Sequence, residues 1–418
     1  MPHTGQVRRI GTALLVGLLT GLGALAGCTG TASPTPPASR PVGSATGSPT
    51  GATTPAPSAA SGVVTGQPKP SSRPATASAT TPVSTQGRPV ASATTITLAF
   101  AGDVHFERHV AGLLGRRDSL VELQPLLGSA DVAVVNLETA ITDRGVPQPK
   151  DYHFRTTPEA LQVLAAAGVD AVSMANNHAV DYGPDGLADS LAAQRSAPLK
   201  VIGIGPTADA AFAPAVFDVR GTSVAVIAAT EVNDLTATRY PATDSRPGVA
   251  AALDRARLVA AVLAARAAYD VVVVFLHWGT ERTTCPDARQ LGTAAALEQV
   301  GADVIVGGHQ HRVLGAGWLG KAYVGYGLGN FVWWLNSRTP ADRASGVLTV
   351  GIDVAAVQAR RSVPRDQWSG LATVARSATL SPLTISFEDG VPRPAQDESA
   401  RLAGFEQARA CTRLRSSP

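Results

Sequence analysis

The chain has few residues of the kinds that most strongly constrain function. Its net charge of +3 over 418 residues is too small to indicate nucleic acid as a partner. Aromatic residues make up only 5% of the sequence. Cysteine occurs only three times, so disulfides cannot be the main support of the fold. There are also only eight histidines. Because histidine is scarce, the places where it occurs are informative.

The first 28 residues resemble a bacterial lipoprotein signal peptide. Arg8 and Arg9 provide positive charge, residues 10–25 form a short apolar run, and Leu-Ala-Gly precedes Cys28. The resemblance implies cleavage before Cys28, lipidation of that residue, and an extracytoplasmic protein anchored to the bacterial cell membrane. The alternative is an uncleaved transmembrane helix, but the apolar run is shorter than the ~20 residues such a helix needs.

The composition changes twice along the chain. Residues 29–93 consist mostly of Thr, Ser, Pro, Ala and Gly, which cannot bury enough apolar surface to fold, so we expect a disordered stalk. From Thr94 onward, runs of Val, Ile, Leu and Ala predict one large domain over residues 94–418.

If Cys28 carries lipid, two cysteines remain. In an oxidising compartment Cys285 and Cys411 would form a disulfide, which would fix the C-terminal segment to the loop after His277. The alternative is a pair of free thiols. Residues 355–418 are weakly patterned, with a strand expected at 383–387 and a helix near the end, and they would form a lid, a covering layer or a tail.

Apolar runs alternate with helical stretches, which predicts an α/β fold. The expected strands cover residues 96–101, 131–135, 170–174, 271–276 and 303–306. The expected helices cover residues 158–167, 186–194, 252–268 and 288–300.

Each expected strand is followed by polar residues that can bind metal. In open α/β sheets ligands bind outside the carboxyl ends of the strands, and five of the eight histidines lie at these ends. Taken singly, Asp103 could belong to a turn and His277 to the core, but the pattern as a whole favours a metal site. The candidate ligands are Asp103, His105, Glu138, Asn177, His277, His309 and His311.

The ligand set predicts two divalent ions. Seven imidazole, carboxylate and amide ligands are too many for one ion, and the absence of a thiolate among them favours Mn, Fe or Zn. Two ions would activate water and stabilise negative charge, as in many phosphatases and nucleases. His178 is expected to protonate the leaving group or stabilise negative charge. Asp181 would either orient His178 or cap the following helix.

Three further residues are candidates for binding substrate. Arg155 would bind an acidic group, although a surface arginine needs no such role. Glu281 would line the site or lie on an exposed loop, and Asn330 would lie near the site or close a turn. Trp333 and Trp334 would face opposite sides of a strand, with one in the core and the other in a pocket wall.

Four stretches resemble the CapA family, the capsule-synthesis proteins linked to poly-γ-glutamate, within the calcineurin-like metallophosphoesterases. They are Val-Val-Asn-Leu-Glu at 134–138, Ala-Asn-Asn-His-Ala-Val-Asp-Tyr-Gly at 175–183, Phe-Leu-His-Trp-Gly-Thr-Glu at 275–281 and Tyr-Gly-Leu-Gly-Asn-Phe at 326–331. The resemblance covers residues 97–350 and implies a metallophosphoesterase-like sandwich of two mixed sheets flanked by helices.

The resemblance also implies roles for the ligands. Asp103, His105 and His311 would hold one ion, Asn177, His277 and His309 the other, and Glu138 would bridge the two. The phosphoesterase pattern has Gly-Asp where this chain has Asn-Leu-Glu138. The longer carboxylate changes the geometry of the bridge and weighs against ordinary phosphoesterase activity.

Three functions follow as hypotheses. The first is a metal-dependent enzyme that makes, anchors or exports an anionic capsule polymer such as poly-γ-glutamate, acting on amide or phosphate linkages. The second is a phosphoesterase for nucleotide or sugar phosphates. The third is a non-catalytic surface component that binds the polymer or a membrane polymer synthase.

Overall fold

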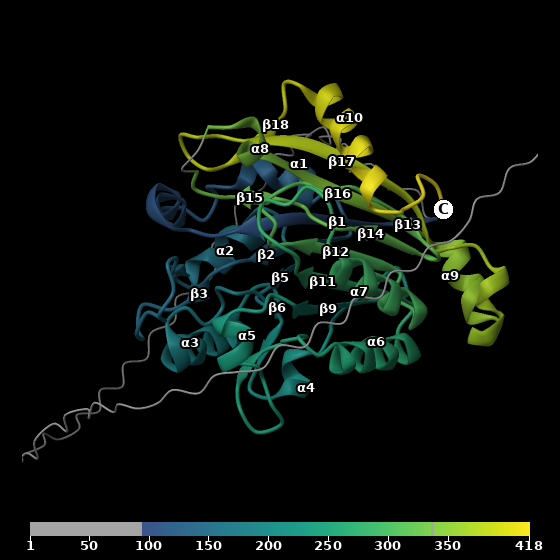
Figure 1. The fold of residues 1–418 in the computed structure, drawn as a ribbon, viewed down its shortest axis with the longest axis horizontal. Helices are drawn as coiled ribbons and strands as arrows, with labels where there is room; N and C mark the ends of the chain where they lie inside the picture. The colour runs from purple at the N-terminus through teal and green to yellow at the C-terminus, as the bar shows by residue number, and fades with distance from the viewer. Residues whose placement is uncertain (1–93, 336–337) are drawn as a thin grey trace, which may run out of the picture. The chain divides into compact units, whose positions relative to one another are not determined.

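Two mixed β-sheets pack face to face in the computed structural model, which describes residues 94–335 and 338–418 (Figure 1). The described residues belong to one compact unit, Ser84–Pro418. The expected signal peptide, Cys28 and the stalk lie outside the described residues. Within the described ranges no helix has the length and apolar character needed to cross a membrane.

The first sheet has the order β18-β17-β16-β1-β2-β5-β6, and β15 also pairs with β1. Strands β1, β2, β5 and β6 run parallel, whereas β16, β17 and β18 add antiparallel strands. Its strands are β1 (Thr95–Val104), β2 (Val132–Leu137), β5 (Ala171–Ser173), β6 (Lys200–Ile202), β15 (Asn330–Val332), β16 (Ala344–Asp353), β17 (Ala375–Ile385) and β18 (Pro392–Pro394).

The second sheet has the order β13-β14-β12-β11-β9-β8, with β9, β11, β12 and β14 parallel. Its strands are β8 (Ala215–Val219), β9 (Thr222–Thr230), β11 (Val271–His277), β12 (Val304–Gly308), β13 (Ala316–Leu319) and β14 (Ala322–Gly325). Two small pairs complete the strands, β3 (Ala140–Ile141) with β4 (Arg155–Thr156) and β7 (Ile204–Gly205) with β10 (Gly248–Val249).

Helices cover the outer faces of both sheets. Helices α2 and α3 pack on the first sheet through Leu161 and Leu187, whereas α6 and α7 pack on the second through Val262 and Leu297. The α-helices are α1 (Gln124–Leu127), α2 (Glu159–Ala166), α3 (Gly183–Ser196), α4 (Ala208–Ala211), α5 (Leu235–Arg239), α6 (Ala256–Ala268), α7 (Ala288–Gln299), α8 (Pro340–Arg343), α9 (Val354–Arg361) and α10 (Glu398–Ala408). The 3₁₀ helices are η1 (Arg108–Gly115), η2 (Val121–Leu123), η3 (Arg365–Gly370) and η4 (Arg409–Cys411).

The core follows from the two-residue period of a strand. In β1, Ile96, Leu98 and Phe100 face the second sheet, whereas Ala99 and Ala101 face the outer helices. The strands of the second sheet are apolar almost throughout because both of their faces are covered. This packing fixes the carboxyl ends of the parallel strands as a rigid platform.

The predicted sandwich of two mixed sheets flanked by helices is confirmed, and so are all five expected strands. Helix α6 begins at Ala256 rather than at residue 252, because the Ala252 amide donates to the Thr230 carbonyl at the end of β9. The C-terminal segment is part of the first sheet, since β17 and β18 extend it and α10 follows.

Candidate metal centre

Five strands of the two sheets bring the predicted ligands to one place. Asp103 lies on β1, Glu138 follows β2, and His277 is the last residue of β11. His309 and His311 follow β12, and Asn177 follows β5. Their side chains form two groups of metal-competent atoms, each group within 4.8 Å.

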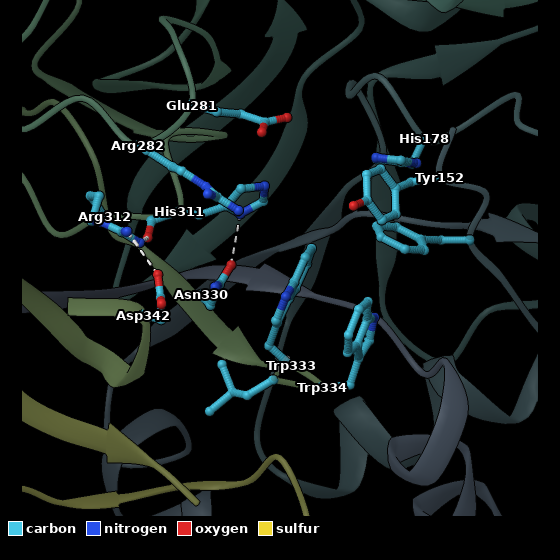
Figure 2. Close-up of a pocket in the computed structure, with 12 residues that line it drawn as sticks. Tyr152, His178, Glu281, Arg282, His311, Arg312, Asn330, Trp333, Trp334 and Asp342 are labelled. Carbon is cyan, nitrogen blue, oxygen red and sulfur yellow. Dashed lines mark hydrogen bonds and ion pairs between the residues drawn. The ribbon is translucent and has the colours of Figure 1, made fainter. Parts of the chain in front are cut away.

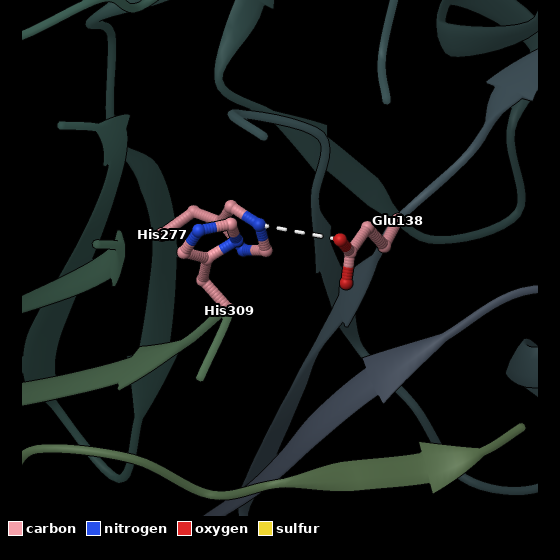
Figure 3. Close-up of side chains that lie close together, drawn as sticks. All are labelled: Glu138, His277 and His309. Atoms are coloured by element: carbon pink, nitrogen blue, oxygen red, sulfur yellow. Dashed lines mark ion pairs between the residues drawn. The ribbon is translucent and has the colours of Figure 1, made fainter. Parts of the chain in front are cut away.

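Site A consists of Glu138, His277 and His309. Figure 3 shows the imidazole of His277 and the carboxylate of Glu138 facing each other, and His277 Nε2 lies 3.3 Å from Glu138 Oε1. Asn177 Oδ1 lies 2.8 Å from the same Nε2 atom. The predicted amide ligand therefore lies beside site A.

Site B consists of Asp103, Glu138 and His311. His311 Nδ1 lies 3.4 Å from Asp103 Oδ2 and 2.7 Å from Asn330 Oδ1. Because Glu138 belongs to both sites, its carboxylate is placed where a bridge between two ions would be.

The backbone around the two histidines after β12 is strained. His309 has φ +95° and His311 has φ +53°, values that non-glycine residues rarely adopt and that cost about 1–3 kcal/mol each. A Cβ at Gly308 would lie 2.3 Å from Asp103 Oδ1, so only glycine leaves room for that carboxylate. Backbone strain at His309 and His311 and the lack of a side chain at Gly308 thus bring the two imidazoles close to the carboxylate of Asp103.

The pKa values of the ligands shift in both directions; burial alone would lower the pKa of His311, but its hydrogen bond with Asp103 raises it to about 9. Burial alone would raise the pKa of Asp103, but the hydrogen bond with His311 and the nearby His277 lower it to about 2. Burial, and then the negative charge of Asp103, raise the pKa of Glu138 well above its ordinary value. Burial lowers the pKa of His277 to about 4 and that of His309 well below its ordinary value. Neutral imidazoles are the form that binds metal.

Several buried atoms at the site have no hydrogen-bond partner among the described residues. They include both carboxylate oxygens of Glu138, which is fully buried, and Nδ1 of His309. Leaving such groups unpartnered in the interior costs several kcal/mol for a charge. Divalent ions at sites A and B would satisfy them, and the imidazole and carboxylate donors fit Mn, Fe or Zn.

His105, the remaining predicted ligand, lies among aromatic rings. It belongs to neither site, and its ring stacks on Phe154 at 4.7 Å and meets Trp333 edge-on at 4.0 Å. Its Nδ1 accepts a hydrogen bond from the Glu107 amide at 3.0 Å. Its Nε2 is buried and has no hydrogen-bond partner among the described residues, so the ligand role of His105 stays a prediction.

Two asparagines that were not predicted organise the ligands. Nδ2 of Asn136 lies 2.8 Å from Asp103 Oδ1 and 3.2 Å from His277 Nδ1, so it links site B to site A. Asn176 donates in turn to Asn136 Oδ1 at 3.1 Å. Both residues lie in stretches that resemble the CapA family, but the sequence gives no sign that they hold other side chains.

His178 is held beside the site by a hydrogen bond with Asp181. Its Nδ1 lies 2.6 Å from Asp181 Oδ2, and its Nε2 lies 3.9 Å from Glu138 Oε1. Asp181 does not cap α3, since its N-cap is Tyr182 without a side-chain bond, so the orienting role predicted for Asp181 fits the structure. Lys150, not predicted from the sequence, contacts Asp181 and donates to the Asn177 carbonyl at 2.7 Å.

A cavity of about 110 Å³ opens beside the two sites (Figure 2). Glu281 and Asn330 line it, as predicted, and so do Arg282 and Arg312. Arg155 does not line this cavity; its guanidinium lies 4.9 Å from the ring centre of Tyr182.

Both neighbouring tryptophans line the cavity, although the sequence predicted opposite orientations. Trp333 and Trp334 follow the end of β15, so the alternation of a strand no longer applies to them. Figure 2 shows the two indoles between His311 on one side and Tyr152 with His178 on the other. The cavity therefore has an aromatic wall, and a second wall on which Arg282 and Arg312 lie with two carboxylates, Glu281 and Asp342.

A disulfide joins Cys285 to Cys411 across 126 residues of sequence. It ties η4 to the loop that carries Glu281 and Arg282. The pairing predicted from the cysteine count is thus present in the structure, and it holds one wall of the cavity to the C-terminal segment.

An α/β sandwich with histidines and carboxylates gathered at the strand ends is typical of a metal-binding protein. Residues 97–333 match the family described as bacterial capsule synthesis protein PGA_cap. The chain belongs to this family. It is 30% identical over 259 residues to the PGA biosynthesis protein CapA of Bacillus subtilis, covering 60% of this chain and 67% of that protein.

The chain is also similar to a second CapA protein and to a solved structure. The capsule biosynthesis protein CapA of Bacillus anthracis is 28% identical, and the match covers 59% of this chain and 62% of that protein. A crystal structure of a phosphatase from Mycoplasma pneumoniae is 14% identical with a TM-score of 0.42, covering 69% of this chain and 94% of that one. Likeness at this level supports no conclusion about activity.

Proposed function

We propose that the protein is a metal-dependent hydrolase of the capsule-synthesis family that acts on amide or phosphate linkages of an anionic surface polymer or its precursors. The observation that carries the proposal is Glu138, a buried carboxylate shared by sites A and B, neither oxygen of which has a hydrogen-bond partner among the described residues. Such a carboxylate is the expected bridge between two ions.

Each ion would be held by its own set of ligands. Asp103 and His311 would hold an ion at site B, and His277, His309 and Asn177 an ion at site A, with Glu138 common to both. Bound divalent ions would supply Lewis acidity and lower the pKa of water.

His178 holds its Nε2 toward the site, because Asp181 fixes its Nδ1, and once protonated it would give a proton to the leaving group or stabilise negative charge. Arg282 and Arg312 line the adjoining cavity and would orient a carboxylate or phosphate of the substrate. Arg312 is paired with Asp342 at 2.7 Å, so we expect Arg282 to be the main residue that binds the substrate anion.

We further propose that the folded unit works outside the cytoplasm on a lipid anchor at Cys28. The signal-like sequence supports this location, and a disulfide between Cys285 and Cys411 suits an oxidising compartment. Labelling cells with a fatty-acid probe tests the anchor, since a Cys28→Ser variant should lose the label.

Metal analysis combined with a substrate screen tests the activity. Full-length protein purified without chelator should contain about two equivalents of transition metal, and Glu138→Gln should lose metal and turnover together. Glu159→Gln changes an exposed carboxylate on α2 and serves as the control. The screen should include phosphodiesters and γ-glutamyl oligomers with added Mn or Zn. Metal-free protein, or a Glu138→Gln variant with full activity, would overturn the proposal.

A further inference from the structure

A second cavity, of about 270 Å³, lies at the amino ends of the parallel strands of the second sheet, and the metal centre lies at their carboxyl ends. Asp303 and Lys321 line it, and they directly precede β12 and β14, whereas the metal ligands lie at the carboxyl ends. The length of β12, about 16 Å at ~3.3 Å per residue, separates the two edges. The cavity is therefore independent of sites A and B.

Two buried arginines share one carboxylate at this cavity. Arg266 Nη1 donates to Asp303 Oδ2 at 2.7 Å, and Arg360 pairs with Asp303 Oδ1. Each arginine residue is only 6% exposed. The indole of Trp368 covers both guanidinium groups, with ring-centre distances of 5.0 Å to Arg266 and 4.8 Å to Arg360. The planar groups are thus stacked and held in fixed orientations.

The charges around the cavity do not balance. Arg365 and Lys321 line it together with Arg360, and Arg266 lies behind it, whereas Asp303 and Glu298 are the acidic residues of the lining. Three cations and two carboxylates line the cavity. One carboxylate oxygen of Glu298 already accepts a hydrogen bond from the backbone amide of Lys321 at 2.9 Å. The surplus of positive charge favours an anion in this cavity.

Buried donors at the same place have no acceptor. The Nε atoms of Arg266 and Arg360 are buried, and neither has a hydrogen-bond partner in the described part of the chain. An unpartnered N–H of a buried guanidinium is costly, so its presence indicates that an acceptor is missing. Arginine donors in a fixed plane match the oxygens of carboxylates and phosphates.

We propose that this cavity binds an oxyanion, a carboxylate or a phosphate, through Lys321, Arg360 and Arg365, with Trp368 as its wall. Placed away from the metal centre, it would hold an anionic chain or a phosphorylated ligand at a second point on the protein. The proposal does not depend on the metal-dependent activity, because no residue is common to the two places.

NMR spectroscopy of the indole N–H groups tests the proposal on the full chain, with the Trp368 signal assigned from a Trp368→Phe variant. Adding inorganic phosphate or a short γ-glutamyl oligomer should give a saturable shift of the Trp368 signal, with or without chelator. Arg365→Met and Lys321→Met should each weaken binding about tenfold, the equivalent of one charged hydrogen bond. Arg257→Met removes the same charge from an exposed ion pair and should leave binding unchanged.

The two probes distinguish the source of the anion. Tighter binding of the γ-glutamyl oligomer than of inorganic phosphate supports a polymer ligand. Tighter binding of phosphate than of the oligomer supports a phosphorylated ligand. The proposal is overturned if neither probe gives a saturable shift, or if Lys321→Met and Arg365→Met bind both probes as tightly as Arg257→Met. A negative result would leave the proposed metal-dependent activity untouched.

Discussion

Gly308→Ala should remove the ion of site B and leave that of site A in place. The added Cβ would lie 2.3 Å from Asp103 Oδ1, and ordinary contact begins near 3.4 Å, so the carboxylate must move by roughly 1 Å. Gly308 does not have a positive φ, so alanine is acceptable to its backbone. Its effect therefore arises from the displaced carboxylate.

The expected loss is about 10–100-fold in affinity for one ion, the usual cost of disturbing the support of a metal ligand. Bound metal should fall from about two equivalents to one, measured by elemental analysis after dialysis against a graded series of metal concentrations. Overpacking costs about 1–3 kcal/mol of stability, so thermal unfolding should confirm a folded variant.

Gly404→Ala is the matched control, because a Cβ there meets no atom within 4 Å. It should bind both ions as the unchanged protein does. If Gly308→Ala keeps two equivalents at unchanged affinity, then Asp103 does not hold the second ion and the assignment of site B is refuted.

Three further predictions concern catalysis, the disulfide and pH. His178→Gln should lower kcat at least 10²-fold while metal content stays unchanged, as expected for a proton donor that binds no ion. Reducing Cys285–Cys411 removes a constraint spanning 126 residues and should lower the free energy of unfolding by at most ~4–5 kcal/mol, measured by denaturant titration with and without reductant. The hydrogen bonds from Arg361 and Ser223 outweigh burial and hold the pKa of Asp270 at about 2. The stability that Asp270 contributes, about 1–2 kcal/mol, is therefore present above pH ~4 and lost as pH falls through 2, so thermal unfolding of Asp270→Asn should show a deficit at pH 7 that disappears near pH 2.

Each of these has an outcome that would contradict it. A His178→Gln variant with normal kcat would place the proton donor elsewhere. Unchanged unfolding after reduction would show that the C-terminal segment holds without its covalent tie. An Asp270→Asn deficit that persists at pH 2 would mean that the residue stabilises by packing and not by charge.

The sequence predicted the platform because its signals are local. The apolar runs in β1, β2, β5, β11 and β12 are short, and each ends in polar residues, so the strands and the edge where ligands gather could be inferred together. His277, His309 and Asp103 lie at that edge as expected. Glu138 is shared by both groups, which suits the predicted bridging role.

What the sequence could not predict depends on contacts between distant segments. The role of Asn136 exists only because β1 and β11 bring Asp103 and His277 to its amide. The surroundings of His105 depend on the Glu107 amide and on aromatic rings from separate loops. Arg155 lies outside the cavity because β4 presents it at the surface, which a sequence pattern does not record.

The short strand β18 has a consequence for self-association. It pairs with residues 383–385 of the eleven-residue strand β17 at the edge of the first sheet, and it begins and ends with proline, at Pro392 and Pro394. Proline has no amide hydrogen to donate, so this edge offers little to a strand from a second molecule. Loss of β18 would leave residues 383–385 of β17 open to pairing with a strand of a second molecule, so this three-residue strand opposes aggregation.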